Sequence, residues 1–250
     1  MKTNNPTGNK PGITNIPGDV RVISFDVGFT LIYTDPPVGE VYAEIAARFG
    51  YHLSGAEIHS RFKKTWKKVT TLNRQKKANN AQAEEKRSYE WWKEIFKESI
   101  GDIFSGGDLE KVFKVCYDEY AGGKYWKLYP EVRSTLDALK AKGYRLVVLS
   151  NWDQRLTRTL QELQLARYFE EIYISTQIGF AKPDPGAFLY ILDDLKIPAR
   201  TLLHVGDTLE EDIRGARQAG VRAFYLDRPG KNQAASLDVP VISSLSELLT

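Results

Sequence analysis

The feature that most constrains the fold is an apolar, β-branched run that ends on a single aspartate, within residues 22–31 (VISFDVGFTL). Such a run is typical of a buried strand in a parallel sheet. Asp26 ends the run, with Gly28 two residues later and Thr30 four residues later. Because ligands bind at the carboxyl ends of strands in open α/β sheets, this segment predicts a carboxylate at a functional edge. One aspartate after one strand is a weak signal, so its partners must come from later segments.

The rest of the chain alternates between strand-like and helix-like segments. Such alternation predicts βαβ units and therefore an α/β fold with a doubly wound, mostly parallel sheet. The pair Asp184-Pro185 is typical of a helix start. The expected later strands are residues 145–150, 172–175, 202–205, 222–226 and a short last one at 241–242.

One block interrupts the alternation after the first strand. Residues 38–125 carry helical periodicity, including the capping box Ser54-Gly55-Ala56-Glu57, apart from a polar loop or frayed turn at 73–83. We interpret residues 37–125 as a helical cap inserted into an α/β core. The expected division is a disordered tail at 1–18, a core at 19–36 and 126–250, and the cap at 37–125.

Composition narrows the class of protein. A chain of 250 residues can bury a sizeable core, and a formal net charge of +3 is too small to argue for a nucleic-acid partner. The single cysteine, Cys116, excludes an intrachain disulfide and fits a reducing cytosol. No apolar run reaches membrane-spanning length, and the amino terminus lacks the apolar centre of a signal peptide. We expect a cytoplasmic monomer or homodimer that takes a small anionic substrate, with no nucleic-acid or membrane partner.

Polar residues stand at the ends of the later strands or at the start of a helix. Ser150 and Asn151 end the second core strand, and Lys182 stands just before a helix. Asp207 and Asp212 follow the fourth core strand. If the strands are parallel, all these residues lie on the same sheet edge as Asp26.

This combination suits phosphoryl transfer. A carboxylate such as Asp26 can attack phosphorus and form an acyl phosphate. Asp26 and Asp207 offer the hard oxygen ligands that Mg²⁺ prefers, and Asp212 could orient a metal-bound water. Lys182 would neutralise phosphoryl charge, while Ser150 and backbone N–H groups at the next helix start would hold phosphoryl oxygens.

In this order the residues resemble the haloacid dehalogenase-like hydrolase superfamily. The similarity covers about residues 20–226, and the helical block resembles the cap of the family's helical-cap subgroup. It implies a Rossmann-like α/β core and a hydrolase. The matching motifs are Asp-x-x-x-Thr at 26–30, Leu-Ser-Asn at 149–151, Lys-Pro-Asp-Pro at 182–185 and Gly-Asp-x-x-x-x-Asp at 206–212.

The resemblance also implies roles for individual residues. Asp26 would be the nucleophile, in a motif that Thr30 completes. Substrate contacts would come from Ser150, Asn151 and Lys182, with Trp152 as a further candidate for the pocket wall. The ligands of Mg²⁺ would be Asp26, the Gly28 carbonyl and Asp207, with Asp212 supporting the metal.

The sequence departs from the family pattern at Gly28. Family phosphatases carry a second aspartate there, which protonates the leaving group and later activates water, worth roughly 10²- to 10⁴-fold. Relatives without it include 2-haloacid dehalogenases and phosphonoacetaldehyde hydrolases. Those dehalogenases work without metal and lack Gly-Asp-x-x-x-x-Asp, so the acidic pair Asp207 and Asp212 favours a Mg²⁺-dependent phosphatase. A 2-haloacid dehalogenase and a catalytically impaired metal- or phosphate-binding scaffold remain the alternatives.

Several other residues have structural interpretations. Residues 61–77 hold eight Lys or Arg and no Asp or Glu, which indicates a solvated helix face more than a basic lid for an anionic substrate. Trp66, Trp92 and Trp126 are expected in the cap interior, with Trp91 facing elsewhere, toward the cleft between cap and core. His204 is expected to pack in or beside the sheet.

Overall fold

The computed structural model describes residues 16–72, 81–228 and 239–250. Most of the expected tail, residues 1–15, and the last part of the basic segment, residues 73–77, lie outside the described residues.

The described residues contain a six-stranded sheet in the order β5-β4-β1-β6-β7-β8. Every neighbouring pair in it is parallel, which confirms the prediction of a mostly parallel, doubly wound sheet. The first strand, β1, lies between β4 and β6, where the winding direction reverses and α/β sheets bind their ligands. The strands are β1 Val22–Phe25, β4 Arg145–Ser150, β5 Glu171–Ile174, β6 Leu202–Gly206, β7 Arg222–Leu226 and β8 Val241–Ile242.

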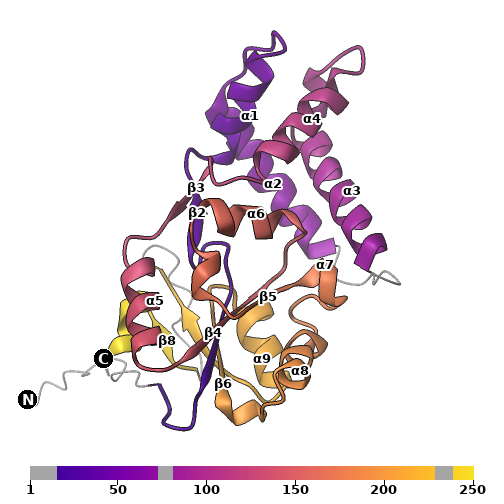
Figure 1. Cartoon of the computed structure of the whole chain (residues 1–250). Helices are drawn as coiled ribbons and strands as arrows, with labels where there is room; N and C mark the ends of the chain where they lie inside the picture. The colour runs from indigo at the N-terminus through magenta and orange to yellow at the C-terminus, as the bar shows by residue number, and fades with distance from the viewer. Residues whose placement is uncertain (1–15, 73–80, 229–238) are drawn as a thin grey trace, which may run out of the picture.

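Helices cover both faces of the sheet, and each face has its own apolar core (Figure 1). Apolar side chains of α5 (Val132–Ala141) and α6 (Arg155–Glu162) pack on one face. On the other face pack α8 (Pro185–Asp194), the π-helical segment η4 (Leu209–Arg214) and α9 (Gly215–Gln218). Asp184 caps α8 by accepting a hydrogen bond from the N–H of Gly186. Short helical segments complete the core: η2 Ala166–Tyr168, α7 Ser175–Ile178, η3 Ala199–Thr201 and η5 Leu245–Leu249.

The helical block stands at one end of the molecule, above the sheet (Figure 1). It has a separate apolar core that includes Tyr42, Phe96, Phe113 and Cys116. Its junction with the core is the antiparallel pair of β2 (Ile32–Thr34) and β3 (Trp126–Leu128). The division of the chain at 36/37 and 125/126 stays a prediction. The elements of the block are α1 Val38–Ala47, α2 Gly55–Leu72, α3 Ala81–Ile100, η1 Gly101–Ile103 and α4 Asp108–Glu119.

A buried carboxylate fastens this block to the sheet. Asp153, which is 0% exposed, pairs with Arg155 at 2.8 Å and accepts hydrogen bonds from Ser88 of α3 and Tyr117 of α4. The Arg155 guanidinium lies 3.6 Å from the centre of the Tyr117 ring. Glu85 of α3 adds hydrogen bonds from the backbone N–H of Gln154. The chain just after β4 therefore fixes where the helices sit over the sheet.

The tryptophans differ in part from the prediction. Trp66, Trp91 and Trp92 contact one another within the helical block, with ring centres 5.0 to 5.6 Å apart. The expectation that Trp126 lies in the cap interior is wrong. It packs on the apolar core of the sheet, and its ring centre lies 5.0 Å from that of Trp152. Its place on β3, beside β2, carries it across to the sheet side.

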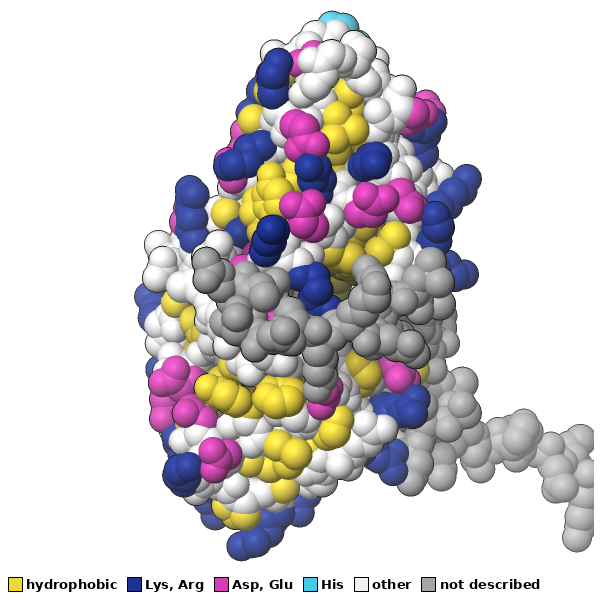
Figure 2. Space-filling model, turned by 90° about the vertical axis from the view of Figure 1, so that its right-hand side faces the viewer, with side chains coloured by type: hydrophobic (Ala, Val, Ile, Leu, Met, Phe, Trp, Pro, Cys, Tyr) yellow, Lys and Arg dark blue, Asp and Glu magenta, His cyan; other side chains and the backbone are white. Residues whose placement is uncertain are grey.

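Charges on the helical block are largely balanced. Arg61 pairs with Asp102 and Lys68 with Glu98, so part of the basic face of α2 meets acidic partners from α3 and η1. On the face in Figure 2, Lys and Arg side chains over this block are interspersed with Asp and Glu. In the described residues, no helix has the length and apolar character needed to cross a membrane.

The contact between α1 and α2 gives the first prediction. A Cβ atom at Gly39 would lie 2.2 Å from the carbonyl oxygen of Gly55 and 2.3 Å from the amide nitrogen of His59. Because both are backbone atoms, the two helices must separate. We expect Gly39→Ala to lower the free energy of unfolding by about 3 kcal/mol in urea titrations.

The matched control is Gly18→Ala, where no atom of the described residues lies within 4 Å of the new Cβ. We expect a change within about 0.5 kcal/mol there. Equal urea midpoints for the two variants would contradict the close contact.

Candidate active site

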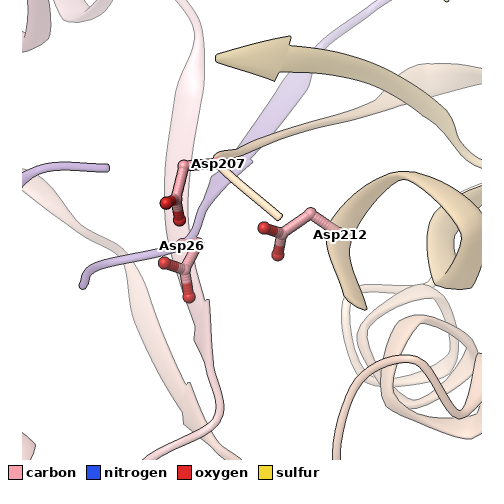
Figure 3. Close-up of side chains that lie close together, drawn as sticks. All are labelled: Asp26, Asp207 and Asp212. Carbon is pink, nitrogen blue, oxygen red and sulfur yellow. The ribbon is translucent and has the colours of Figure 1, made fainter. Parts of the chain in front are cut away.

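Three carboxylates from separate segments meet at the carboxyl edge of the sheet (Figure 3). Asp26 follows β1, Asp207 follows β6, and Asp212 lies in η4. Since Phe25 and Val205 are paired in register, the two strands end at the same level and present their aspartates side by side. Ligand oxygens of the three residues lie within 4.8 Å of one another, and all three residues are buried.

A buried ammonium joins two of these carboxylates. Lys182 is 3% exposed, and its Nζ donates hydrogen bonds to Asp26 Oδ1 at 2.8 Å and to Asp212 Oδ1 at 2.5 Å. The Ser150 hydroxyl also donates to Asp26 Oδ1, at 3.2 Å. The structure therefore brings together Asp26, Ser150, Lys182 and Asp212, as the motifs predict.

The backbone of Lys182 is held as firmly as its side chain. The Asn151 amide accepts from the Lys182 N–H and donates to the Lys182 carbonyl, both at 2.8 Å. The same Nδ2 donates to Glu211 Oε2 at 3.0 Å. Glu211 precedes Asp212 in the chain, and Asp212 pairs with the Lys182 ammonium. The contacts therefore form a closed ring that runs from the Lys182 backbone through Asn151, Glu211 and Asp212 to the Lys182 side chain.

Sequence reasoning missed Glu211. The available signal was the acidic run Glu210-Glu211-Asp212, in which only Asp212 matches a motif. Burial raises the pKa of Glu211 to about 7, against the lowering effect of Lys182.

Asp212 is fixed from below by the sheet. Its Oδ1 accepts from His204 Nε2 at 3.1 Å, and its Oδ2 accepts from the Thr208 N–H at 2.9 Å. His204 is fully buried, as expected, and its Nδ1 lies 2.8 Å from Ser24 Oγ. Burial lowers the pKa of His204, whereas its hydrogen bond to Asp212 acts in the opposite direction. A Cβ at Gly206 would lie 2.1 Å from Asp212 Cγ, so only glycine fits there.

Thr30 and Arg228 position the loop after β1. Thr30 Oγ1 donates to Asp207 Oδ1 at 3.4 Å, which ties this loop to the end of β6. Arg228 donates to the Thr30 carbonyl at 2.6 Å and to Glu131 at 2.8 Å. Its guanidinium lies 3.4 Å from the centre of the Tyr129 ring. Arg228 lies outside the predicted motifs, and no spacing in the sequence points to it.

Gly28 and Trp152 lie next to each other, although 124 positions separate them in the chain. A Cβ built at Gly28 would lie 3.7 Å from Trp152 Cζ3. The predicted role of Trp152 as a pocket wall is compatible with this position. The roles predicted for the Gly28 carbonyl, for Asn151 and for the other site residues stay predictions.

The charges of the cluster fit a divalent cation. Three carboxylates meet one ammonium, and burial lowers the pKa of the neighbouring His204. Burial raises the pKa of Asp26, whereas Lys182 opposes this. The pKa of Asp212 lies below its usual range because Lys182 and His204 outweigh the effect of burial. Clustered buried carboxylates are hard oxygen donors, and a divalent cation would compensate their excess negative charge.

Known proteins are similar to this chain in sequence and in fold. The model of the haloacid dehalogenase-like hydrolase family matches residues 20–220. Over 234 residues, covering 92% of this chain and 95% of the relative, the chain is 31% identical to haloacid dehalogenase-like hydrolase domain-containing protein 3 of Danio rerio. A phosphoserine phosphatase of Thermus thermophilus is 33% identical over 135 residues, which is 54% of this chain and 53% of that enzyme.

A solved structure shows the same fold. The 2-haloacid dehalogenase from Pseudomonas syringae pv. Tomato DC3000 superimposes with a TM-score of 0.62 and 25% identity, over 92% of this chain and 96% of that one. Both a phosphatase and a dehalogenase are therefore among the similar proteins, and the choice between these activities depends on the site.

The ring through Asn151 gives a prediction about Glu211. Glu211→Leu removes the acceptor for one proton of the Asn151 side-chain amide, whereas Glu211→Gln keeps an acceptor oxygen. We expect the Leu variant to exchange that proton with solvent about tenfold faster, equivalent to ~1.4 kcal/mol for one hydrogen bond. The measurement is NMR hydrogen exchange of ¹⁵N-labelled side-chain amides. Equal exchange in the two variants would show that Glu211 does not hold Asn151.

Proposed function

The chain belongs to the haloacid dehalogenase-like hydrolase family, and from this premise we propose that it is a Mg²⁺-dependent phosphatase. It would hydrolyse a small phosphorylated metabolite through an aspartyl-phosphate on Asp26. The observation that carries the proposal is that Lys182 forms ion pairs with both Asp26 and Asp212, next to the third carboxylate, Asp207.

The chain's own residues support a two-step reaction. A side-chain oxygen of Asp26 attacks phosphorus, the bond from phosphorus to the leaving oxygen breaks, and the leaving group departs with the electron pair and takes a proton from water. A water molecule then attacks the phosphorus of the aspartyl-phosphate. This step releases inorganic phosphate and regenerates the Asp26 carboxylate.

Ser150 and Lys182 position the nucleophile and receive the phosphoryl group. Both donate hydrogen bonds to Oδ1 of Asp26, which orients the carboxylate and directs its other oxygen, Oδ2, to attack. In this proposal the ammonium and the hydroxyl would also stabilise the charge that develops on the transferred group. Asn151 keeps Lys182 in place through its backbone.

The metal would be held by Asp26 and Asp207, with Asp212 in support because its oxygens already serve Lys182, His204 and Thr208. Bound there, Mg²⁺ would offset the repulsion between the anionic nucleophile and the anionic substrate.

The enzyme alternative is hydrolysis of a carbon–halogen bond by the same Asp26. A carboxylate can attack a neutral carbon atom without a cation to offset repulsion. For that reaction, three buried carboxylates would cost folding free energy without a catalytic benefit. We therefore favour the phosphatase. Halide release from a 2-haloacid that persists in EDTA would select the dehalogenase instead.

A cytoplasmic location is part of the proposal. Cys116 is a buried free thiol, and a protein with one unpaired cysteine suits a reducing compartment.

Asp26→Asn tests the nucleophile. The amide is a far weaker nucleophile than the carboxylate, so we expect turnover of acetyl phosphate and p-nitrophenyl phosphate with Mg²⁺ to fall by at least about 10³-fold. Label from ³²P substrate should be trapped on the quenched wild-type protein, in a form that hydroxylamine releases, and not on the variant. The matched control is Asp35→Asn, an exposed aspartate nine positions later, which should keep wild-type turnover.

Two results would overturn parts of this assignment. Wild-type turnover by Asp26→Asn would remove Asp26 as nucleophile. If a broad panel of phosphoesters and acyl phosphates shows no turnover above that variant, and no halide is released from a 2-haloacid, the chain is a binding scaffold and not an enzyme.

Asp207→Asn tests the metal site. Replacing a carboxylate by a neutral amide removes charge from the cluster, and we expect Mg²⁺ affinity, measured by isothermal titration calorimetry, to fall about tenfold or more. Asp137→Asn on the exposed side of α5 is the control and should bind Mg²⁺ as the wild type does. Unchanged affinity in Asp207→Asn would place the metal elsewhere or remove it from the reaction.

A further inference from the structure

Buried polar atoms without hydrogen-bond partners gather at the carboxyl end of β7. The described residues hold seven such side-chain atoms, and one each belongs to Tyr225, Asp227 and Arg228. Native proteins contain few of these atoms, because each one costs free energy when it is buried away from water. Arg228 has other partners in Thr30 and Glu131. The Tyr225 hydroxyl and Asp227 Oδ1 therefore need another explanation.

Tyr225 and Asp227 lie beside the carboxylates of the active site. Tyr225 is 0% exposed and pairs in register with Gly206, and adjacent strands of a sheet lie about 4.8 Å apart. Asp207 directly follows Gly206, and one residue separates Asp227 from Tyr225, so both carboxylates leave the same edge of the sheet. Burial, together with the charges of Asp227, Asp207 and Asp212, raises the pKa of the Tyr225 hydroxyl to about 12. The phenolic oxygen is therefore within electrostatic reach of the cluster.

The sheet holds both residues at this place. The N–H groups of Tyr225 and Asp227 donate to the carbonyls of Pro240 at 2.9 Å and Ile242 at 2.8 Å. The Tyr225 hydroxyl and Asp227 Oδ1 do not bond each other, since both atoms lack a partner among the described residues. A small ligand beside Asp207 can therefore bond both groups while the backbone stays in place.

Water has the chemistry that these two groups require. It donates to a carboxylate oxygen and to a phenolic oxygen, and a buried water makes about three hydrogen bonds. Mg²⁺ is usually bound through one or two carboxylates and keeps several of its waters. Those waters donate hydrogen bonds, so they need acceptors in the protein around the metal. Asp227 Oδ1 and Tyr225 Oη are acceptors next to Asp207, the proposed metal ligand.

We propose that Tyr225 and Asp227 position the metal from outside its ligands, by jointly holding a water that Mg²⁺ retains at Asp207. This inference rests on the proposed function, which assigns Mg²⁺ to Asp26 and Asp207. Neither Tyr225 nor Asp227 belongs to a motif of the sequence analysis. Both are positioning residues, because they touch the water and not the substrate. Groups that orient the surroundings of a metal in this way contribute about 10- to 100-fold to its affinity.

Tyr225→Phe is the first test, because it removes one hydroxyl and no charge. We expect the Mg²⁺ affinity of the full chain, measured by isothermal titration calorimetry, to fall about tenfold. The hydroxyl has no partner in the protein, so the urea midpoint without Mg²⁺ should stay at or above that of the wild type. A lower urea midpoint with unchanged Mg²⁺ affinity would show a purely structural hydroxyl and overturn the proposal.

Tyr173→Phe is the matched control. Tyr173 is another buried tyrosine in the same apolar core as Tyr225, and its hydroxyl donates to Asp194 at 2.7 Å. Its loss should lower the urea midpoint, because Asp194 loses a donor, and should leave Mg²⁺ affinity unchanged. The two tyrosine variants are thus expected to respond in opposite ways. An equal loss of Mg²⁺ affinity in both variants would overturn the specific role of Tyr225.

A double-mutant cycle tests whether one water links the two residues. We expect Asp227→Asn to lower Mg²⁺ affinity about tenfold, whereas Asp193→Asn, an exposed aspartate on α8, should bind as the wild type does. If both residues act through one water, Tyr225→Phe combined with Asp227→Asn should lose little more than the weaker-binding single variant. A full product of the two losses, about 100-fold, would overturn the shared water.

The same titrations distinguish this inference from the proposed function. If the wild type takes up Mg²⁺ and Tyr225→Phe binds it as tightly, the role of Tyr225 and Asp227 is rejected and the proposed metal site stands. If the wild type takes up no Mg²⁺, both are rejected. Neither result depends on finding a substrate, because the probe is the metal alone.

Discussion

The contact on which the rest of the site depends is the buried ammonium of Lys182 between Asp26 and Asp212. A lysine that is 3% exposed is tolerated only when carboxylates compensate its charge, and each carboxylate in turn is tolerated because of the lysine. Its Nζ joins the end of β1 to η4, while its backbone is held through Asn151 by the end of β4. Removing any one of these groups leaves a buried charge without its partner, so the three segments are stable only as a set. One ammonium does not balance three carboxylates, and the divalent cation proposed for this site would offset the remaining negative charge.

Hydrogen bonds from the sheet explain why Asp212 stays in contact with Lys182. Ser24 of β1 and His204 of β6 are adjacent in the sheet, and their side chains form a hydrogen-bonded pair next to Asp212. The glycine at 206 lets the carboxylate pack directly on the strand end. The pairing of β1 with β6 thereby fixes the position of the Asp212 carboxylate at the end of the sheet. Asp212 therefore holds Lys182 and is itself held by His204 and Thr208.

Most of the sheet and much of the site could be predicted from the sequence, because both follow from local patterns. Parallel strands end on one edge, so residues at strand ends, such as Asp26 and Asp207, must be near each other once the strands are recognised. Contacts made by loops could not be predicted in this way. Glu211 meets Asn151 from 60 positions away, and Arg228 meets the Thr30 carbonyl from 198 positions away. Trp126 shows the same limit, because its position beside the sheet is set by the pairing of β3 with β2 and not by helical periodicity.

Four consecutive residues, the last of β4 and the three that follow it, contact different parts of the molecule. Ser150 contacts Asp26, Asn151 holds the backbone of Lys182, Trp152 lies next to Gly28, and Asp153 anchors the helical block. A backbone this short cannot shift at one end without disturbing the other. A displacement of α3 or α4 that pulled on Asp153 would therefore reach the tryptophan first and then Asn151 and Lys182. The arrangement ties the position of the helical block to the groups around Asp26 through one short stretch of backbone.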